Sequence, residues 1–249
     1  MEYVDHRSRI RFPSPDQANV WGMVAQGGNL SPGVVLSAYE QGIFPWYEEP
    51  PIVWFSPDPR FVLYLDHFHI GKRFLREMRR SRVSVTMDRA FDTVIHRCRA
   101  TRLTGGGEGT WITSDMERAY AELHGLGYTH SVEVWSGDDL VGGLYGVAVG
   151  GIFAGESMFS AVPGGSKFAL VALVGLMDEL KLPLIDCQSY TDNLARFGAE
   201  DVPRETYLRY LEDLRFVDAI PRSWREVNGA EMLQRGVDRA RMNDARRSQ

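Results

Sequence analysis

Glu156 is a carboxylate inside an apolar stretch, residues 154–159, that reads as a buried strand. A buried carboxylate destabilises a fold unless it has a partner or a chemical task. Asp186 and Gln188 follow the apolar pair Leu184-Ile185 with one residue between them, so they project from the same face of a strand. Adjacent strands would bring these groups near Glu156, where they could hold or transfer a proton. A polar network that only stabilises the fold explains the same residues about equally well.

The glycines between these two segments form a second candidate feature. The loop at residues 162–166 precedes an apolar helix expected over 167–180, and the start of a helix can bind an anion. A simple helix start has the same sequence. The strand, loop and helix are similar to the pyrophosphate loop of the GNAT acyltransferases. The Gln/Arg-x-x-Gly-x-Gly/Ala spacing of that loop is absent, so we expect neither coenzyme A nor another cofactor.

The net charge of −5 is distributed unevenly along the chain. Residues 68–102 hold ten Lys or Arg against three acids, a local charge of +7, which leaves −12 for the other 214 residues. A helix over 71–82 would place its apolar residues on one side and its basic residues on the other. Those basic residues are Lys72, Arg73, Arg76, Arg79 and Arg80. The helix is either a phosphate-binding surface or a solvated face over a core stripe.

The pattern of elements predicts an α+β fold in which helices cover a mixed central sheet. Ser31 and Pro32 begin a helix, and Ser114 with Glu117 forms a capping box. Strands are expected at 61–65, 83–87 and 184–187, with an antiparallel meander over 131–135, 140–149 and 152–159. The glycine-rich stretch 105–109 is expected to be a loop. We divide the chain into an aromatic, Pro-rich domain at 1–60, a catalytic domain at 61–230 and a disordered Arg-rich tail at 231–249.

Several classes of protein are excluded. The chain has no run of 18 apolar residues and a polar N-terminus, so we expect no membrane span and no signal peptide. Cys98 and Cys187 are the two cysteines and form no CxxC motif, which excludes a disulfide framework and a zinc ribbon. We therefore expect a cytoplasmic protein without a metal. We also expect a monomer, because no heptad pattern is visible.

Six short blocks, taken together, resemble the leucyl/phenylalanyl-tRNA–protein transferases. They run in order through most of the chain and read FPW at 44–46, WFSPDPR at 54–60, GTWIT at 109–113, HSVEVW at 130–135, GESMFS at 155–160 and IDCQ at 185–188. The resemblance implies a small N-terminal domain followed by a GNAT-like domain. It also implies transfer of Leu or Phe, and Met less well, from aminoacyl-tRNA to proteins that begin with Arg or Lys. Such tagging marks the acceptor for N-end rule degradation.

The resemblance assigns roles to particular residues. Gln188, polarised by Asp186, would accept or orient the proton of the acceptor amine, and Glu156 would hold the cationic terminus or the tRNA end. Trp46, Trp111 and Tyr120 would offer aromatic surfaces to the terminal adenosine. An apolar slot for Leu or Phe would be formed by Leu144, Phe153, Gly155 and Met158. The basic helix would bind acceptor-stem phosphates. Asn193 stands where the family commonly has His.

Two other functions remain open. An acyl-CoA-dependent N-acyltransferase is disfavoured by the missing pyrophosphate spacing, and coenzyme A binding would distinguish it. A noncatalytic RNA-binding protein would use the basic helix and the aromatic residues. That function leaves Glu156, Asp186 and Gln188 without a task, and a Leu-transfer assay would distinguish it.

Overall fold

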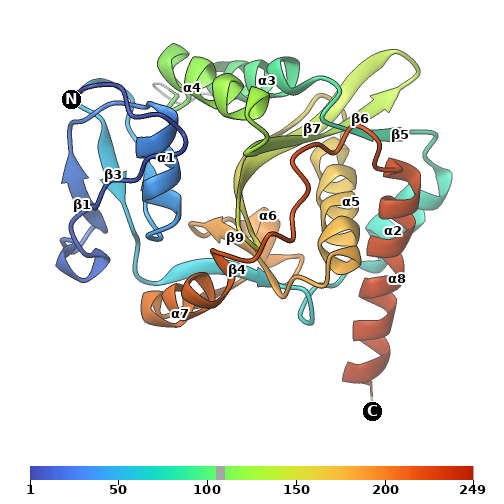
Figure 1. Cartoon of the computed structure of the whole chain (residues 1–249). Coiled ribbons are helices and arrows are strands. Elements are labelled where there is room, and N and C mark those ends of the chain that lie inside the picture. Colours follow the sequence, from blue (N-terminus) through green and yellow to red (C-terminus); the bar gives the residue numbers. More distant parts are fainter. Residues whose placement is uncertain (105–109, 249) are drawn as a thin grey trace.

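The computed structural model describes residues 1–104 and 110–248 and has two sheets (Figure 1). Within these residues a three-stranded sheet in the order β1-β3-β2 belongs to the N-terminal region, and a seven-stranded sheet in the order β10-β4-β9-β8-β7-β6-β5 forms the centre. Every pair in the central sheet is antiparallel except β8 with β9. The predicted α+β class with a mixed central sheet is confirmed. The stretch 105–109, expected to be a loop, lies outside the described residues.

The strands fall close to their predicted positions. The N-terminal sheet consists of β1 (Met23–Gln26), β2 (Phe44–Pro45) and β3 (Val53–Phe55). The central sheet consists of β4 (Arg60–Tyr64), β5 (Ser84–Met87), β6 (Thr129–Ser136), β7 (Asp139–Val149), β8 (Ile152–Ser160), β9 (Leu184–Gln188) and β10 (Glu200–Val202). The meander β6-β7-β8 turns at Gly137 and Gly150, whose φ angles of 60° and 58° favour glycine.

Helices cover both faces of the central sheet. In chain order the helical elements are η1 (Pro15–Gln17), α1 (Pro32–Tyr39), α2 (Lys72–Arg80), α3 (Phe91–Thr104), α4 (Ser114–Gly125), α5 (Gly165–Glu179), α6 (Asp192–Ala195), α7 (Arg204–Leu214) and α8 (Gly229–Arg247). On β7, Leu144 and Ala148 join the core around α5, whereas Tyr145 and Val147 join a second core that contains α1, α3 and α4. The N-terminal helix α1 thus packs directly against the central domain.

One predicted helix start is shifted by a residue. Thr113, not Ser114, is the N-cap of α4, and its hydroxyl accepts a hydrogen bond from the N–H of Met116. Glu117 does not close a capping box but forms an ion pair with Arg99 of α3. The helix therefore begins with Ser114, and Thr113 before it satisfies one of the free backbone N–H groups of the first turn.

The predicted disordered tail is wrong, because most of it forms helix α8. Asn228 caps this helix by accepting a hydrogen bond from the N–H of Glu231. Figure 1 shows α8 alongside α5, and a Cβ added at Gly175 of α5 would lie 1.9 Å from the carbonyl oxygen of Met232. A Cβ at Gly236 would likewise lie 2.0 Å from the carbonyl oxygen of Val171. Glycine at both positions therefore lets the two helices approach closely.

Candidate active site

The two parallel strands β8 and β9 pair over only two positions, Phe153 with Ile185 and Ala154 with Asp186. Beyond these positions no further pair is formed, so the strands stop sharing backbone hydrogen bonds. The next residues with side chains facing each other are Glu156 and Gln188, and Gln188 Nε2 donates to Glu156 Oε1 at 2.6 Å. A hydrogen bond between side chains therefore joins β8 and β9 just beyond their last backbone pair.

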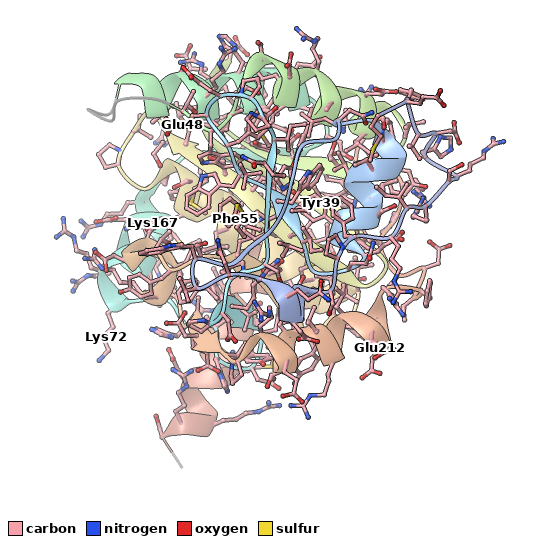
Figure 2. The ribbon with its side chains drawn as sticks, turned by 90° about the vertical axis from the view of Figure 1, so that its left-hand side faces the viewer. Tyr39, Glu48, Phe55, Lys72, Lys167 and Glu212 are labelled. Atoms are coloured by element: carbon pink, nitrogen blue, oxygen red, sulfur yellow. The ribbon has the colours of Figure 1, made fainter. Side chains whose placement is uncertain are left out.

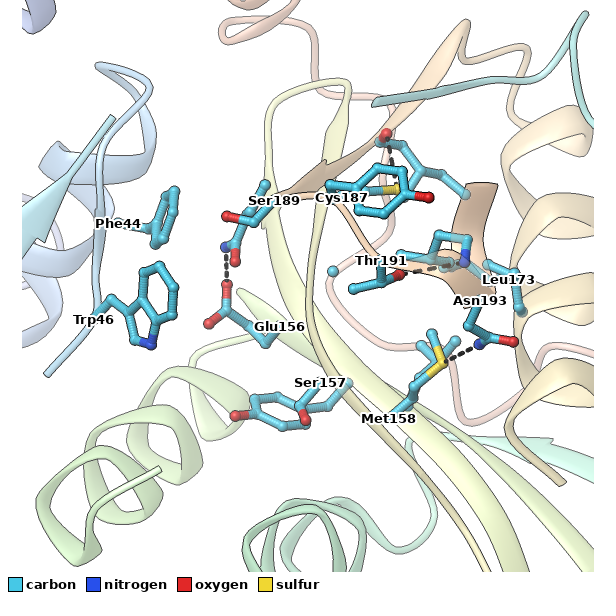
Figure 3. A pocket seen from close by; sticks show the side chains of 18 of the residues that line it. Phe44, Trp46, Glu156, Ser157, Met158, Leu173, Cys187, Ser189, Thr191 and Asn193 are labelled. Atoms are coloured by element: carbon cyan, nitrogen blue, oxygen red, sulfur yellow. Dashed lines mark hydrogen bonds between the residues drawn. The ribbon is translucent and has the colours of Figure 1, made fainter. Parts of the chain in front are cut away.

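A cavity of about 350 Å³ opens at this point (Figure 3). Phe44 of β2 and Trp46, which follows that strand, face it from one side, and Glu156 and Met158 of β8 lie on the other. Its apolar wall also includes Leu144, Leu170, Leu173 and Ile185. The cavity is thus mostly apolar and has a few convergent polar groups, as is typical of small-ligand sites.

Glu156 is the buried carboxylate of this cavity, with 6% of its surface exposed. Besides Gln188, the hydroxyl of Tyr39 donates to Oε1 at 2.6 Å and that of Tyr120 donates to Oε2 at 3.3 Å. Among the described residues no Lys or Arg forms an ion pair with it. Burial raises the pKa of Glu156 to about 7, against the opposing effect of these three hydrogen bonds.

The two tyrosines also contact each other, with 2.6 Å between their hydroxyl oxygens. Either hydroxyl can be the donor in that contact. When Glu156 is ionised, either both hydroxyl protons point toward it, or one points toward it and the other lies between the two tyrosine oxygens. When Glu156 is protonated, a tyrosine oxygen can accept its proton. The Tyr39–Tyr120 pair therefore satisfies Glu156 in both protonation states without a cation.

Asp186 lies behind Gln188 and is engaged by a cation. Arg60 donates to both of its oxygens, from Nε at 2.8 Å and from Nη2 at 2.6 Å, and Tyr207 donates to Oδ2 at 2.9 Å. Arg60 and Asp186 are both fully buried. The guanidinium is also sandwiched between the rings of Phe44 and Tyr207, at 4.8 and 4.4 Å. This ion pair links β4, β9, α7 and the N-terminal region behind the cavity.

Asp186 reaches Gln188 through the backbone and not through the side-chain amide. Its Oδ1 accepts a hydrogen bond from the N–H of Gln188 at 2.9 Å. Gln188 adopts a φ of 63°, a left-handed conformation that is uncommon for residues other than glycine. The bond to Asp186 holds this strained turn, which aims the amide at Glu156.

Of the predicted slot and adenosine residues, Trp46, Trp111, Leu144, Gly155 and Met158 line the cavity. Trp46 is 46% exposed and can stack on a ligand. The other two, Tyr120 and Phe153, do not line it. The Tyr120 ring is fully buried and supports Glu156 through its hydroxyl, and Phe153 is buried against the Trp224 ring, away from the cavity.

The residues that support the polar groups of the site from behind the cavity were not predicted. Tyr39, Arg60 and Tyr207 hold the polar groups but come from elements far away in the chain. Only Arg60 lay in one of the recognised blocks. Asn193 of α6 lines the cavity and donates to the Met158 sulfur at 3.4 Å, as Figure 3 shows.

The predicted basic helix is confirmed as an amphipathic helix on the surface, α2. Phe74 is its buried residue, and Leu75 and Met78 pack against the core. The residues Lys72, Arg73, Arg76, Arg79 and Arg80 are all exposed. Figure 2 shows Lys72 and Lys167 on the same side of the molecule, with Glu212 on the other. The Lys167 ammonium lies 5.6 Å from the Phe74 ring.

The structure offers neither a metal cluster nor a membrane span in the part of the chain that it describes. No group of three or more His, Cys, Asp or Glu side chains in this part could hold a metal ion. No helix described here combines the length and the apolar character needed to cross a membrane.

Comparison with known proteins identifies the family of the chain. The family model for leucyl/phenylalanyl-tRNA protein transferase matches residues 62–212, and the model for its N-terminal domain matches residues 28–58. Proteins named leucyl/phenylalanyl-tRNA–protein transferase are similar over most of their length. That of Anaeromyxobacter sp. (strain Fw109-5) is 50% identical over 203 residues, which cover 81% of this chain and 86% of the relative.

Two further relatives have the same name. The protein of Maridesulfovibrio salexigens is 46% identical over 220 residues, 88% of this chain and 91% of the relative. That of Klebsiella pneumoniae (strain 342) is 48% identical over 212 residues, 84% of this chain and 89% of the relative. The family model and these relatives define an aminoacyltransferase, and this chain is an enzyme of that class. The chain belongs to the leucyl/phenylalanyl-tRNA–protein transferase family.

The raised pKa of Glu156 makes stability depend on pH. A carboxyl whose pKa is higher in the folded state stabilises the fold below about pH 4.5, and this contribution is lost as the pH rises through about 7. From pH 5 to pH 8 the wild-type protein should therefore lose roughly 2 to 3 kcal/mol of stability relative to Glu156→Gln. Urea unfolding at several pH values measures this difference. The exposed Glu212 provides a control as Glu212→Gln, and a pH-independent gap between wild type and Glu156→Gln would contradict the account.

Proposed function

We propose that this chain transfers Leu or Phe, and Met less readily, from aminoacyl-tRNA to the α-amino group of proteins that begin with Arg or Lys. The new N-terminal residue would mark the acceptor for N-end rule degradation. The observation that carries the proposal is the buried Glu156 carboxylate, which faces an apolar cavity and is supported by neutral groups alone. A carboxylate without a countercharge favours a cationic ligand, and an acceptor α-ammonium group is such a ligand.

The donor side of the cavity suits an aminoacyl ester. The apolar wall of Leu144, Met158, Leu170 and Leu173 would accept a Leu or Phe side chain. Such a wall excludes charged side chains through the cost of desolvation, but it separates similar apolar side chains only weakly, which leaves room for Met. The exposed ring of Trp46 would stack on the terminal adenosine, a contact worth ~1–3 kcal/mol.

The chemistry requires the loss of two protons from the acceptor, because its α-ammonium group has three N–H bonds and the peptide nitrogen has one. The α-ammonium group has a pKa near ~8, so Glu156, with a pKa of about 7, can take the first proton at a small energetic cost. The free amine attacks the ester carbonyl carbon and the new C–N bond forms. The nitrogen then loses its second proton, and the bond to the 3′ oxygen of the adenosine breaks. That oxygen takes up one of the two protons, which Glu156 can return to it, and the other proton goes to the solvent. The products are a peptide and deacylated tRNA.

Gln188 would orient the amine during this step. Its Nε2 is committed to Glu156, so its carbonyl Oε1 remains to accept an N–H of the acceptor. Asp186 would act through the backbone N–H of Gln188, by holding the turn. Because the ester is already activated, positioning these groups supplies most of what the reaction needs.

Helix α2 is the proposed binding surface for the phosphates of the tRNA acceptor stem. Lys72 and Arg73 lie in its first turn, where the helix dipole is already positive, and no acidic residue offsets them there. This arrangement does not stabilise the helix, but it strengthens attraction of an anion. Phosphate contacts of this kind carry no sequence information, so the enzyme could accept different tRNAs.

We further propose that the catalytic domain, at 61–230, is GNAT-like and follows an N-terminal domain at 1–60. The antiparallel meander β6-β7-β8 and the parallel strands β8 and β9, which stop pairing at the cavity, support the GNAT-like assignment. A monomeric enzyme in the cytoplasm that uses no cofactor is consistent with a reaction whose donor is already activated.

A transfer assay tests this function. Wild-type protein, radiolabelled Leu-tRNA and a peptide that begins with Arg should give a labelled peptide, and the same peptide acetylated at its N-terminus should remain unlabelled. Glu156→Gln should lower kcat/KM by roughly 10²-fold or more, because it removes the proton acceptor. Glu212→Gln is the control and should match wild type. Labelling of the acetylated peptide, or full activity of Glu156→Gln, would contradict the mechanism.

The salt dependence of tRNA affinity tests the role of α2. For the wild type, log Kd for aminoacyl-tRNA should rise steeply with log salt concentration, because each neutralised phosphate releases counterions. Lys72→Gln and Arg76→Gln should each lower the slope by about one unit or less. Arg209→Gln, on the exposed face of α7, controls for loss of charge alone. A flat salt response of the wild type would remove α2 from the binding surface.

A further inference from the structure

Helix α8 lies outside residues 62–212, the range that the family model matches, and the proposed function gives it no task. Its sequence is rich in Arg, which suggests binding to RNA. However, Arg235 and Arg239 both form ion pairs with Asp178 of α5, and Arg246 pairs with Asp66. These pairs neutralise much of the charge of α8 within the protein. The arginines therefore support packing more than they offer a cationic surface.

The C-terminal half of α8 binds the segment that joins β4 to α2. The contact is centred on Asn243, which is 2% exposed. Its Nδ2 donates to the carbonyl oxygen of Leu65 at 2.7 Å and to that of Phe68 at 2.9 Å. Both bonds go to backbone atoms, so they fix the course of the chain between residues 65 and 68 and not only the place of one side chain.

Two arginines of α8 extend this contact on either side of Asn243. Arg239 donates from Nε to the carbonyl oxygen of Leu65 at 3.2 Å and also pairs with Asp66. Arg247 donates from Nη2 to the carbonyl oxygen of His67 at 2.7 Å. Three consecutive turns of α8 thus bind one short loop, immediately before the helix that holds the proposed phosphate-binding residues.

Helix α2 is anchored through a narrow apolar face. Phe74 is its buried residue and contacts the rings of Phe168 and Phe197, with Leu75 and Met78 partly buried beside it. Its N-cap, Gly71, provides no side-chain cap. The positive charges in its first turn oppose the helix dipole. Helices with little buried surface are the parts of a fold that open most readily. The orientation of α2 therefore depends strongly on the loop that leads into it.

We propose that α8 is a positioning element for tRNA binding: by holding the loop at residues 65–69, it fixes α2 so that its cationic face meets the acceptor stem. Asn243 is the central positioning residue, and it acts at a distance from the chemical site. The inference rests on the proposed function of α2. In this proposal tRNA binding and chemistry depend on different contacts. Loss of the α8 contacts weakens binding of the tRNA stem but leaves Glu156 and Gln188 in place.

The first test is Asn243→Ala, which changes no charge. Ordering α2 only after tRNA binds costs free energy, so KM for Phe-tRNA should rise about fivefold while kcat at saturating tRNA stays the same. A minimal donor, adenosine esterified with Phe at its 3′ oxygen, has no stem and should react equally well with wild type and variant. Amide hydrogen exchange should become faster in α2 and remain unchanged in β8 and β9.

A second pair of variants guards against misfolding of Asn243→Ala. Arg247→Gln removes an exposed contact to His67, whereas Arg241→Gln removes the same charge from the same helix and breaks a bond only to Asp238 of α8 itself. Arg247→Gln should raise KM for Phe-tRNA about threefold more than Arg241→Gln does. Equal effects would show that charge alone matters and would overturn the proposal.

The other outcomes are equally distinct. An unchanged KM and unchanged exchange in α2 for Asn243→Ala would overturn the positioning role. An equal loss with Phe-tRNA and with the minimal donor would also overturn it, because damage would then extend to the chemical site. If wild type transfers from neither donor, the proposed function fails, whereas faster exchange in α2 of Asn243→Ala would still support the structural coupling.

Discussion

The site depends on the point where β8 and β9 stop pairing. Had the two strands continued, their backbones would satisfy each other and no cavity would form between them. Instead the side chains of Glu156 and Gln188 span the opening, and burial leaves the carboxyl poised near neutrality. Hydroxyls of Tyr39 and Tyr120 satisfy its hydrogen-bonding needs without neutralising its charge. The countercharge is left to be supplied by a ligand.

The two buried carboxyl groups of the site, Asp186 and Glu156, have different roles because only Asp186 is paired with a cation among the described residues. Asp186 is held by a buried guanidinium, Arg60, and serves as a fixed support behind the turn at Gln188. Glu156 has no such cation among the described residues and can gain and lose a proton.

The proposed acceptor is cationic and the proposed donor is polyanionic. The net charge of −5 conceals both, because residues 68–102, which include α2, have a net positive charge and the acidic excess lies elsewhere.

Local patterns predicted what is local. The meander, the buried strand before Asp186 and the amphipathic helix α2 follow from alternation, short turns and helical spacing. The partners of Glu156 could not be predicted in this way, since Tyr39 is separated from it by 117 positions and its only local signal is an apolar helix. The disordered tail at 231–249 is a wrong prediction for a related reason. The sequence of the tail indicates solvated arginines, because their partners Asp66 and Asp178 are remote in sequence.

The central claim is that the carboxyl of Glu156 has a pKa near 7 and gains a cationic partner only when a ligand binds. The titration of Glu156 itself tests this claim most directly. In protein labelled with ¹³C at Glu side-chain carboxyls, with Glu156→Gln to assign the signal, the Glu156 resonance should titrate near pH 7. A peptide that begins with Arg, added without tRNA, should lower that pKa, and its acetylated form should not. A titration near the ordinary value of 4.5, unmoved by the peptide, would contradict the account.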